Sequence, residues 1–102
     1  MALFGKRTDL AVPDGVSNNK EAFEILRVWV TQQGLTVTLK SGVWEDPAAY
    51  GIMLADLARH IADAFKQGQG KDFDATLHRI LEGLNAEFTS PTDTPTGKIQ
   101  VN

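Results

Sequence analysis

The fold is decided by residues 26–39, LRVWVTQQGLTVTL, in which apolar and polar side chains alternate along two short runs. Successive side chains of a strand point to opposite faces, so this alternation indicates two strands that share one aliphatic face. Between the runs, Gln32-Gln33-Gly34 predicts a turn, because glycine tolerates a positive φ. The aliphatic face, which we expect to form the core, consists of Leu26, Val28, Val30, Leu35, Val37 and Leu39.

We predict a hairpin register in which Val30 lies opposite Val37. This register also places Arg27 opposite Lys40, and like charges that face each other directly across two strands are unfavourable. A carboxylate is needed to relieve the repulsion, and Glu24, Glu45 or an acidic residue from elsewhere in the chain are the candidates.

The second face of the hairpin carries Ile25, Arg27 and Trp29. Tryptophan and arginine are enriched where protein interfaces bury their centres, so these three residues are candidates for a contact surface. The alternative is that a helix or the N-terminal arm of the same chain covers Trp29. We favour the contact surface.

A long helix is predicted after the hairpin, beginning at a Trp-Glu-Asp-Pro segment. The Asp46 side chain can cap free amide groups, and Pro47 suits the first helical position because its missing N–H is not needed there. We expect the helix to reach about Gln67, where Gly68 and Gly70 end it. Beside its broad apolar face runs a small-residue stripe, a candidate for close contact with another element, formed by Gly51, Ala55, Ala58 and Ala62.

A second helix is predicted from Asp72 to about Phe88, with one narrow apolar stripe. Gly83 lies within it and could permit close contact with the small-residue stripe of the first helix. The pattern as a whole predicts an α+β fold, in which an antiparallel β-hairpin packs against two α-helices in β-β-α-α order.

We divide the chain into an extended N-terminal arm over residues 1–22, a single α+β domain over residues 23–88 and a flexible C-terminal tail over residues 89–102. The tail begins where the composition changes to proline, threonine and serine. A lone hairpin is marginal in water, so we expect it to be extended by Leu10–Val12 of the arm, by Lys98–Asn102 of the tail or by a second subunit.

The composition of the 102 residues is that of an ordinary globular protein, with 42% apolar and 23% charged residues. The net charge of −3 and the scattered basic residues argue against nucleic-acid binding, which needs a basic surface. The chain contains no cysteine, no apolar signal segment and no run long enough to span a membrane. We therefore expect a cytoplasmic protein.

Catalytic chemistry finds little support in the sequence. None of the serines lies in a Gly-x-Ser-x-Gly elbow. Asp56 and His60 share a helical face, but zinc sites usually need three or four protein ligands. We expect no metal, no cofactor and no catalytic residue, and we leave open whether the protein is an enzyme, with a non-enzyme favoured.

A pocket between the sheet and the helices is the alternative site. Candidates for one rim of such a pocket are Trp44, Tyr50, Arg59 and His60.

The stretches Glu24–Val30, Gly34–Leu39 and Trp44–His60 together resemble a bacterial family of short proteins known only as a domain of unknown function. The similarity covers roughly residues 23–88 and rests mainly on the Trp-Glu-Asp-Pro segment. The resemblance implies a bacterial cytoplasmic origin and brings no activity, cofactor or catalytic residue.

Two hypotheses about function follow. The first is a homo-oligomeric protein-interaction module, most simply a homodimer, because the open hairpin, Trp29 and the two-faced first helix all offer contact surfaces. The second is a small-molecule-binding protein or weak enzyme with the pocket described above.

Overall fold

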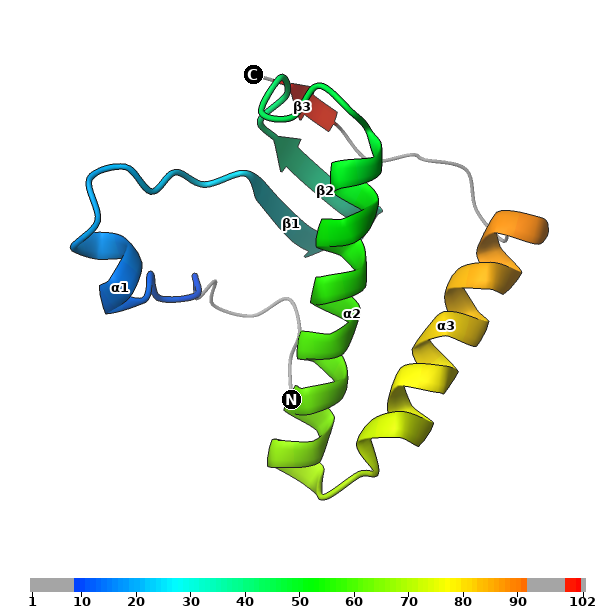
Figure 1. The fold of residues 1–102 in the computed structure, drawn as a ribbon. Helices are drawn as coiled ribbons and strands as arrows, with labels where there is room; N and C mark the ends of the chain where they lie inside the picture. Colours follow the sequence, from blue (N-terminus) through cyan, green and yellow to red (C-terminus); the bar gives the residue numbers. More distant parts are fainter. Residues whose placement is uncertain (1–8, 92–98, 102) are drawn as a thin grey trace. The chain divides into compact units, whose positions relative to one another are not determined.

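The computed structural model describes residues 9–91 and 99–101. The elements in chain order are α1 (Asp14–Ser17), β1 (Leu26–Thr31), β2 (Gly34–Leu39), α2 (Ala48–Gln69), α3 (Phe73–Thr89) and β3 (Ile99–Val101) (Figure 1). The predicted α+β fold, with an antiparallel hairpin followed by two helices, is confirmed. The chain divides into a unit of Met1–Val43 with Pro95–Asn102, which holds the sheet, and a helical unit of Trp44–Thr94.

The hairpin of β1 and β2 closes through a two-residue turn, Gln32-Gln33, with Thr31 opposite Gly34. Gly34 has a φ of 117°, which side chains with a Cβ rarely adopt. The Thr31 hydroxyl holds the turn, donating to the Gly34 carbonyl at 3.1 Å and accepting from the Gln33 amide at 3.2 Å. A glycine in the turn was therefore required, as the sequence indicates.

The predicted register is wrong by two residues, because the turn is tighter than expected. Val28 lies opposite Val37, and Val30 lies opposite Leu35. A shift of two positions keeps every side chain on its predicted face, since side chains alternate with a period of two. The aliphatic face therefore has the predicted composition with different cross-strand neighbours.

The shift also removes the predicted repulsion between Arg27 and Lys40. Arg27 lies opposite Thr38, and the Lys40 amide donates to the carbonyl of Ile25 at 2.9 Å. Of the two candidates Glu24 and Glu45, it is Glu24 that supplies a carboxylate to Arg27.

The third strand comes from the C-terminal tail. β3 pairs in parallel with β2, with Val37 opposite Ile99 and Leu39 opposite Val101. The strand order is β1-β2-β3, so β2 is central and β1 lies at an edge (Figure 1). Leu10–Val12 of the arm forms no strand, and Leu10 is 96% exposed.

α2 begins where the sequence places it. The Ala48 amide donates to the Asp46 side chain at 3.0 Å, directly after Pro47. The helix ends at Gly70, whose φ of 67° is left-handed and whose amide donates to the Lys66 carbonyl. Gly68 lies inside the helix, so the prediction that it also ends α2 is wrong.

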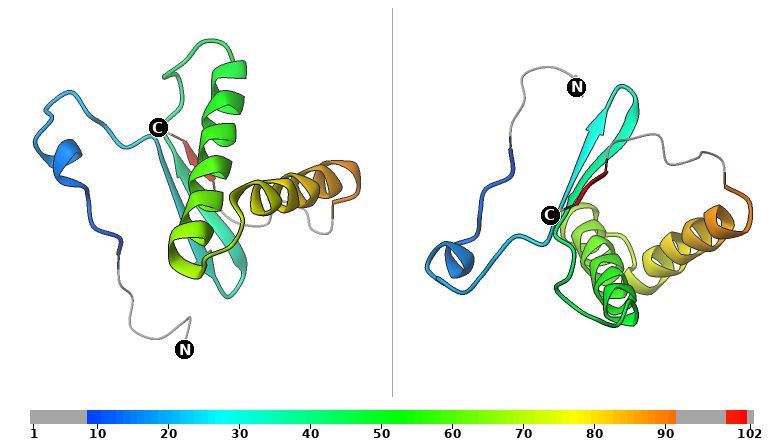
Figure 2. Two further views of the ribbon diagram at one scale, coloured as in Figure 1. Left: turned by 60° about the horizontal axis from the view of Figure 1, so that its bottom comes forward. Right: turned by 90° about the horizontal axis from the view of Figure 1, so that it is seen from above.

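α3 is capped by Asp72, whose side chain accepts from the Ala75 amide at 2.9 Å. α2 and α3 contact each other and diverge from the short connection between them (Figures 1 and 2). Ala62 of α2 is fully buried and is the one buried residue within residues 9–91. A Cβ added at Gly83 would meet nothing within 4 Å, so the predicted close approach at this glycine does not occur.

Candidate functional site

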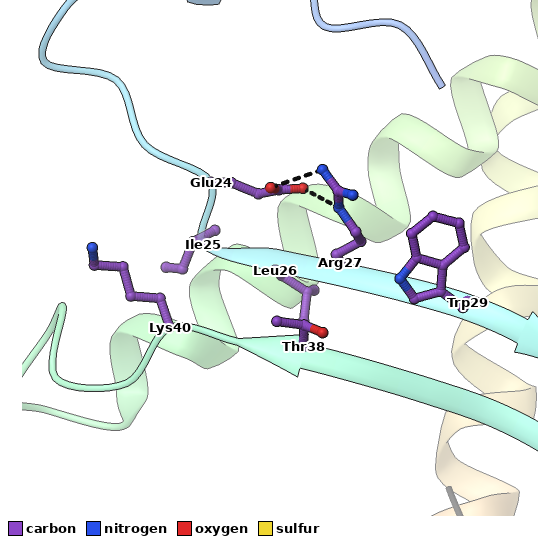
Figure 3. Close-up of a pocket in the computed structure, with 7 residues that line it drawn as sticks. All are labelled: Glu24, Ile25, Leu26, Arg27, Trp29, Thr38 and Lys40. Carbon is purple, nitrogen blue, oxygen red and sulfur yellow. Dashed lines mark hydrogen bonds and ion pairs between the residues drawn. The ribbon is translucent and has the colours of Figure 1, made fainter. Parts of the chain in front are cut away.

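A pocket of about 350 Å³ lies in the sheet unit, at the start of β1 and the end of β2 (Figure 3). Such a volume is near the lower limit of ordinary ligand sites. The pocket mixes charged, aromatic and aliphatic side chains and is lined by Glu24, Ile25, Leu26, Arg27, Trp29, Thr38 and Lys40.

Glu24 and Arg27 form a bidentate ion pair at the rim of this pocket. Arg27 Nε donates to Glu24 Oε1 at 2.6 Å, and Nη2 donates to Oε2 at 3.0 Å (Figure 3). The hydrogen bond to Glu24, and then its negative charge, raise the pKa of Arg27 above its ordinary value. Both side chains are about half exposed, so the pair orients the guanidinium more than it stabilises the fold.

The two cations of the pocket lie over aromatic rings. The guanidinium carbon of Arg27 is 5.5 Å from the ring centroid of Trp29, and Lys40 Nζ is 5.1 Å from that of Phe23. Both distances lie within the range of cation–π contacts. The structure thus brings Ile25, Arg27 and Trp29, the residues predicted for this face, to one pocket, with Trp29 and Ile25 half-buried.

Half of the aliphatic face of the hairpin is exposed, while Leu26, Val37 and Leu39 are half-buried. Val28 is 49% exposed, Val30 67% and Leu35 57%. The alternation in the sequence predicted that these three side chains belong to the core, and that prediction is wrong. Alternation identifies a face as apolar but does not say what covers it, so no signal in the strands themselves could have separated the two cases.

The small-residue stripe of α2 divides into two parts. Ala62 is fully buried and Ala58 is half-buried, whereas Gly51 and Ala55 are exposed. A Cβ added at Gly51 would meet nothing within 4 Å. The stripe is therefore packed only in the half nearer to the connection with α3.

The four residues expected to line a pocket rim do not gather at one place. The rings of Trp44 and Tyr50 meet edge to face, with centroids 5.0 Å apart. Arg59 and His60 are exposed, and His60 follows Tyr50 by ten residues of one helix, a rise of about 15 Å. His60 Nε2 instead lies 3.3 Å from Asp56 Oδ2 on the surface of α2.

Among the described residues, no three His, Asp or Glu side chains come together in a group that could hold a metal ion. The described helices also include none with the length and apolar character needed to cross a membrane.

Two comparisons relate the chain to known proteins, and a third finds no match. Residues 9–92 match the model of a domain of unknown function, DUF5076. A solved structure from the photosynthetic bacterium Rhodopseudomonas palustrus CGA009, described as that of a candidate pyruvate dehydrogenase, is 32% identical, with a TM-score of 0.71. The match covers 91% of this chain and 95% of that one. No curated protein matches. The chain therefore belongs to the DUF5076 family, as the resemblance to a family of unknown function implied.

Proposed function

We propose that this protein is a homo-oligomeric interaction module, in the simplest case a homodimer, whose assembly covers apolar surface that one chain leaves exposed. A single observation carries the proposal: within residues 9–91 only Ala62 is buried, while large apolar side chains are exposed in both units.

In the sheet unit the exposed apolar residues include Val28, Val30 and Leu35, which are neighbours on one face. In the helical unit Ile52 is 72% exposed and Phe88 79%. Single exposed apolar side chains are normal, but adjacent ones on a sheet face mark contact sites. Full burial of such a side chain from full exposure stabilises a protein by about 1.5–3 kcal/mol, and between 49% and 79% of each of these side chains is still exposed, so association would add the larger part of that amount for each one that it covers.

The cytoplasm is the compartment that we propose for this module, on the basis of a chain without cysteine. A further protein partner could bind the grooves and helix faces that self-association leaves open. We assign no catalytic residue.

The test is the solution mass of the full chain, measured by light scattering over a concentration series. We expect a stable species of twice the chain mass of 11.1 kDa, or a higher multiple. A mass of one chain at all concentrations would overturn the proposal and leave the exposed apolar residues for a different partner.

The alternative is a small-molecule-binding protein or weak enzyme, and the specific observation in its favour is the pocket beside β1. Arg27 and Lys40 bring two positive charges to it, although Glu24 already engages Arg27. The solved relative's description suggests pyruvate, a small carboxylate, as the first ligand to try. If the alternative holds, titration with pyruvate should shift the NMR signals of the residues that line this pocket. Unshifted signals at millimolar pyruvate would exclude pyruvate as the ligand.

A further inference from the structure

We propose that two copies of the chain join through their β1 strands, antiparallel to each other, around a two-fold axis beside Val28. This inference rests on the proposed homo-oligomeric function and adds the surface and the register. Arg27 of each copy then faces Trp29 of the other.

The residues of β1 alternate between directing their backbone N–H and C=O groups to β2 and directing them away from the hairpin. The amide of Lys40 donates to the carbonyl of Ile25, so this pair exchanges hydrogen bonds across the hairpin. Hydrogen-bonded pairs recur at every second position of an antiparallel ladder. Arg27 and Trp29 therefore direct their amide and carbonyl groups to β2.

The groups that point away from the hairpin are those of Leu26, Val28 and Val30. The order β1-β2-β3 leaves this side of β1 without a strand partner in the described part of the chain. Proteins usually protect such an edge with a proline, a bulge or several charged residues. β1 has no proline, pairs with β2 without a bulge and carries one charged residue, so its edge is suited to pairing with another strand.

Symmetry and charge then select the register. A two-fold axis beside Val28 pairs Val28 with Val28 of the second copy and Leu26 with Val30, which uses all three outward-facing residues. An axis beside Arg27 would set two arginines directly opposite each other, an unfavourable pair. An axis beside Trp29 would carry Leu26 past the end of the second strand, opposite Gln32 in the turn. Axes between residues are excluded, because they would pair outward groups with inward ones.

The selected register is complementary on both faces. On the aliphatic face, the exposed side chains of Val28 and Val30 meet Val28 and Leu26 of the second copy, so the apolar surface continues across the axis. On the opposite face, Arg27 lies across from Trp29 of the second copy in a pair whose Cα atoms are about 4.5 Å apart. The guanidinium already lies over Trp29 of its own chain and can contact both rings. The product is one continuous sheet in the order β3-β2-β1-β1-β2-β3.

Cysteine cross-linking tests this register, because the chain has no cysteine of its own. In the Val28→Cys variant the two cysteines face each other with Cα atoms about 5.5 Å apart, which a disulfide can span. In the matched variant Val30→Cys the two cysteines are four residues out of register, about 13 Å along the strand. We expect mild oxidation to cross-link most of the first variant and little of the second. A mixture of Leu26→Cys and Val30→Cys should cross-link as the heterodimer.

Light scattering of the same samples under reducing conditions distinguishes a wrong β1 register from a wrong homo-oligomeric function. A dimer that cross-links through Val30→Cys alone, or through none of the variants, would overturn the β1 register while the homo-oligomeric function stands. A monomer at all concentrations would overturn both.

A measurement on the unaltered chain guards against variants that fail to fold. The amides of Leu26, Val28 and Val30 should exchange with deuterium about tenfold more slowly in concentrated than in dilute solution, since pairing protects them. Exchange that does not depend on concentration in a sample shown to be dimeric would overturn the β1 register.

Discussion

Arg27 lies over the indole of Trp29, two residues along the same strand and on the same face, with its guanidinium carbon 5.5 Å from the ring centroid. Glu24 holds the guanidinium from its other side through two hydrogen bonds. The cation is thereby oriented along the edge strand β1, where a second copy of the chain would meet it.

Reversing the charge of Arg27 should weaken self-association. In Arg27→Glu two carboxylates, at positions 24 and 27, lie close together, and the attraction to the indole of the second copy is lost. We expect the dimer dissociation constant to rise at least about tenfold. Light scattering over a dilution series measures the change.

Arg79→Glu is the matched control, because Arg79 also forms an exposed ion pair with a glutamate three residues away, Glu82, at 3.6 Å. Arg79 lies in α3, away from β1 in the sequence, so this variant should leave the dimer dissociation constant unchanged. Equal weakening by both variants would show a general effect of net charge rather than a contact of Arg27.

A charge exchange across the proposed axis gives a second test. Leu26→Lys alone should weaken association, because a lysine then faces Val30 of the second copy. The double variant Leu26→Lys with Val30→Glu should recover part of the loss, since each lysine then faces a glutamate. The dimer dissociation constants of the two variants, measured side by side at low salt, show whether positions 26 and 30 of the two copies face each other. A double variant weaker than the single one would argue against the pairing of positions 26 and 30.

The left-handed backbone at the end of α2 predicts opposite effects of one substitution at two glycines. Gly70→Ala should lower the free energy of unfolding by about 1–2 kcal/mol, because a Cβ is unfavourable at a φ of 67°. Gly68→Ala should raise it by about 0.5–1 kcal/mol, because Gly68 is helical and open space surrounds its added Cβ. Urea denaturation measures both, and equal effects would contradict the assigned end of the helix.

The divided small-residue stripe of α2 predicts that leucine is tolerated in one half only. Ala62→Leu should destabilise the protein by about 1–3 kcal/mol, since Ala62 is fully buried and has no room for three further carbons. Ala55→Leu is the control in the same stripe and should change the unfolding free energy by less than about 0.5 kcal/mol, because Ala55 is exposed. If Ala55→Leu instead abolishes the dimer in light scattering, the exposed half of the stripe is an interface.

The sequence alone was enough to predict the strands and helix starts, because their signals lie in neighbouring residues. Alternation over residues 26–39 predicted both strands, and Asp46 and Asp72 marked the starts of two helices that the structure places there. The contact of Trp44 with Tyr50 is local in the same sense, since the two residues flank one helix start. These features depend on backbone preferences and on side chains a few residues apart, so neighbouring residues contain the information.

The tertiary structure alone decided the features that depend on distant residues. The register of the hairpin followed from the tightness of the turn at Gly34, and the identity of the third strand followed from the pairing of Val37 with Ile99, sixty-two positions later. The exposure of Val28 and Val30 likewise depends on residues that are distant in the sequence. Periodicity shows that a face is apolar, but which surface covers that face is set by long-range packing and by other chains.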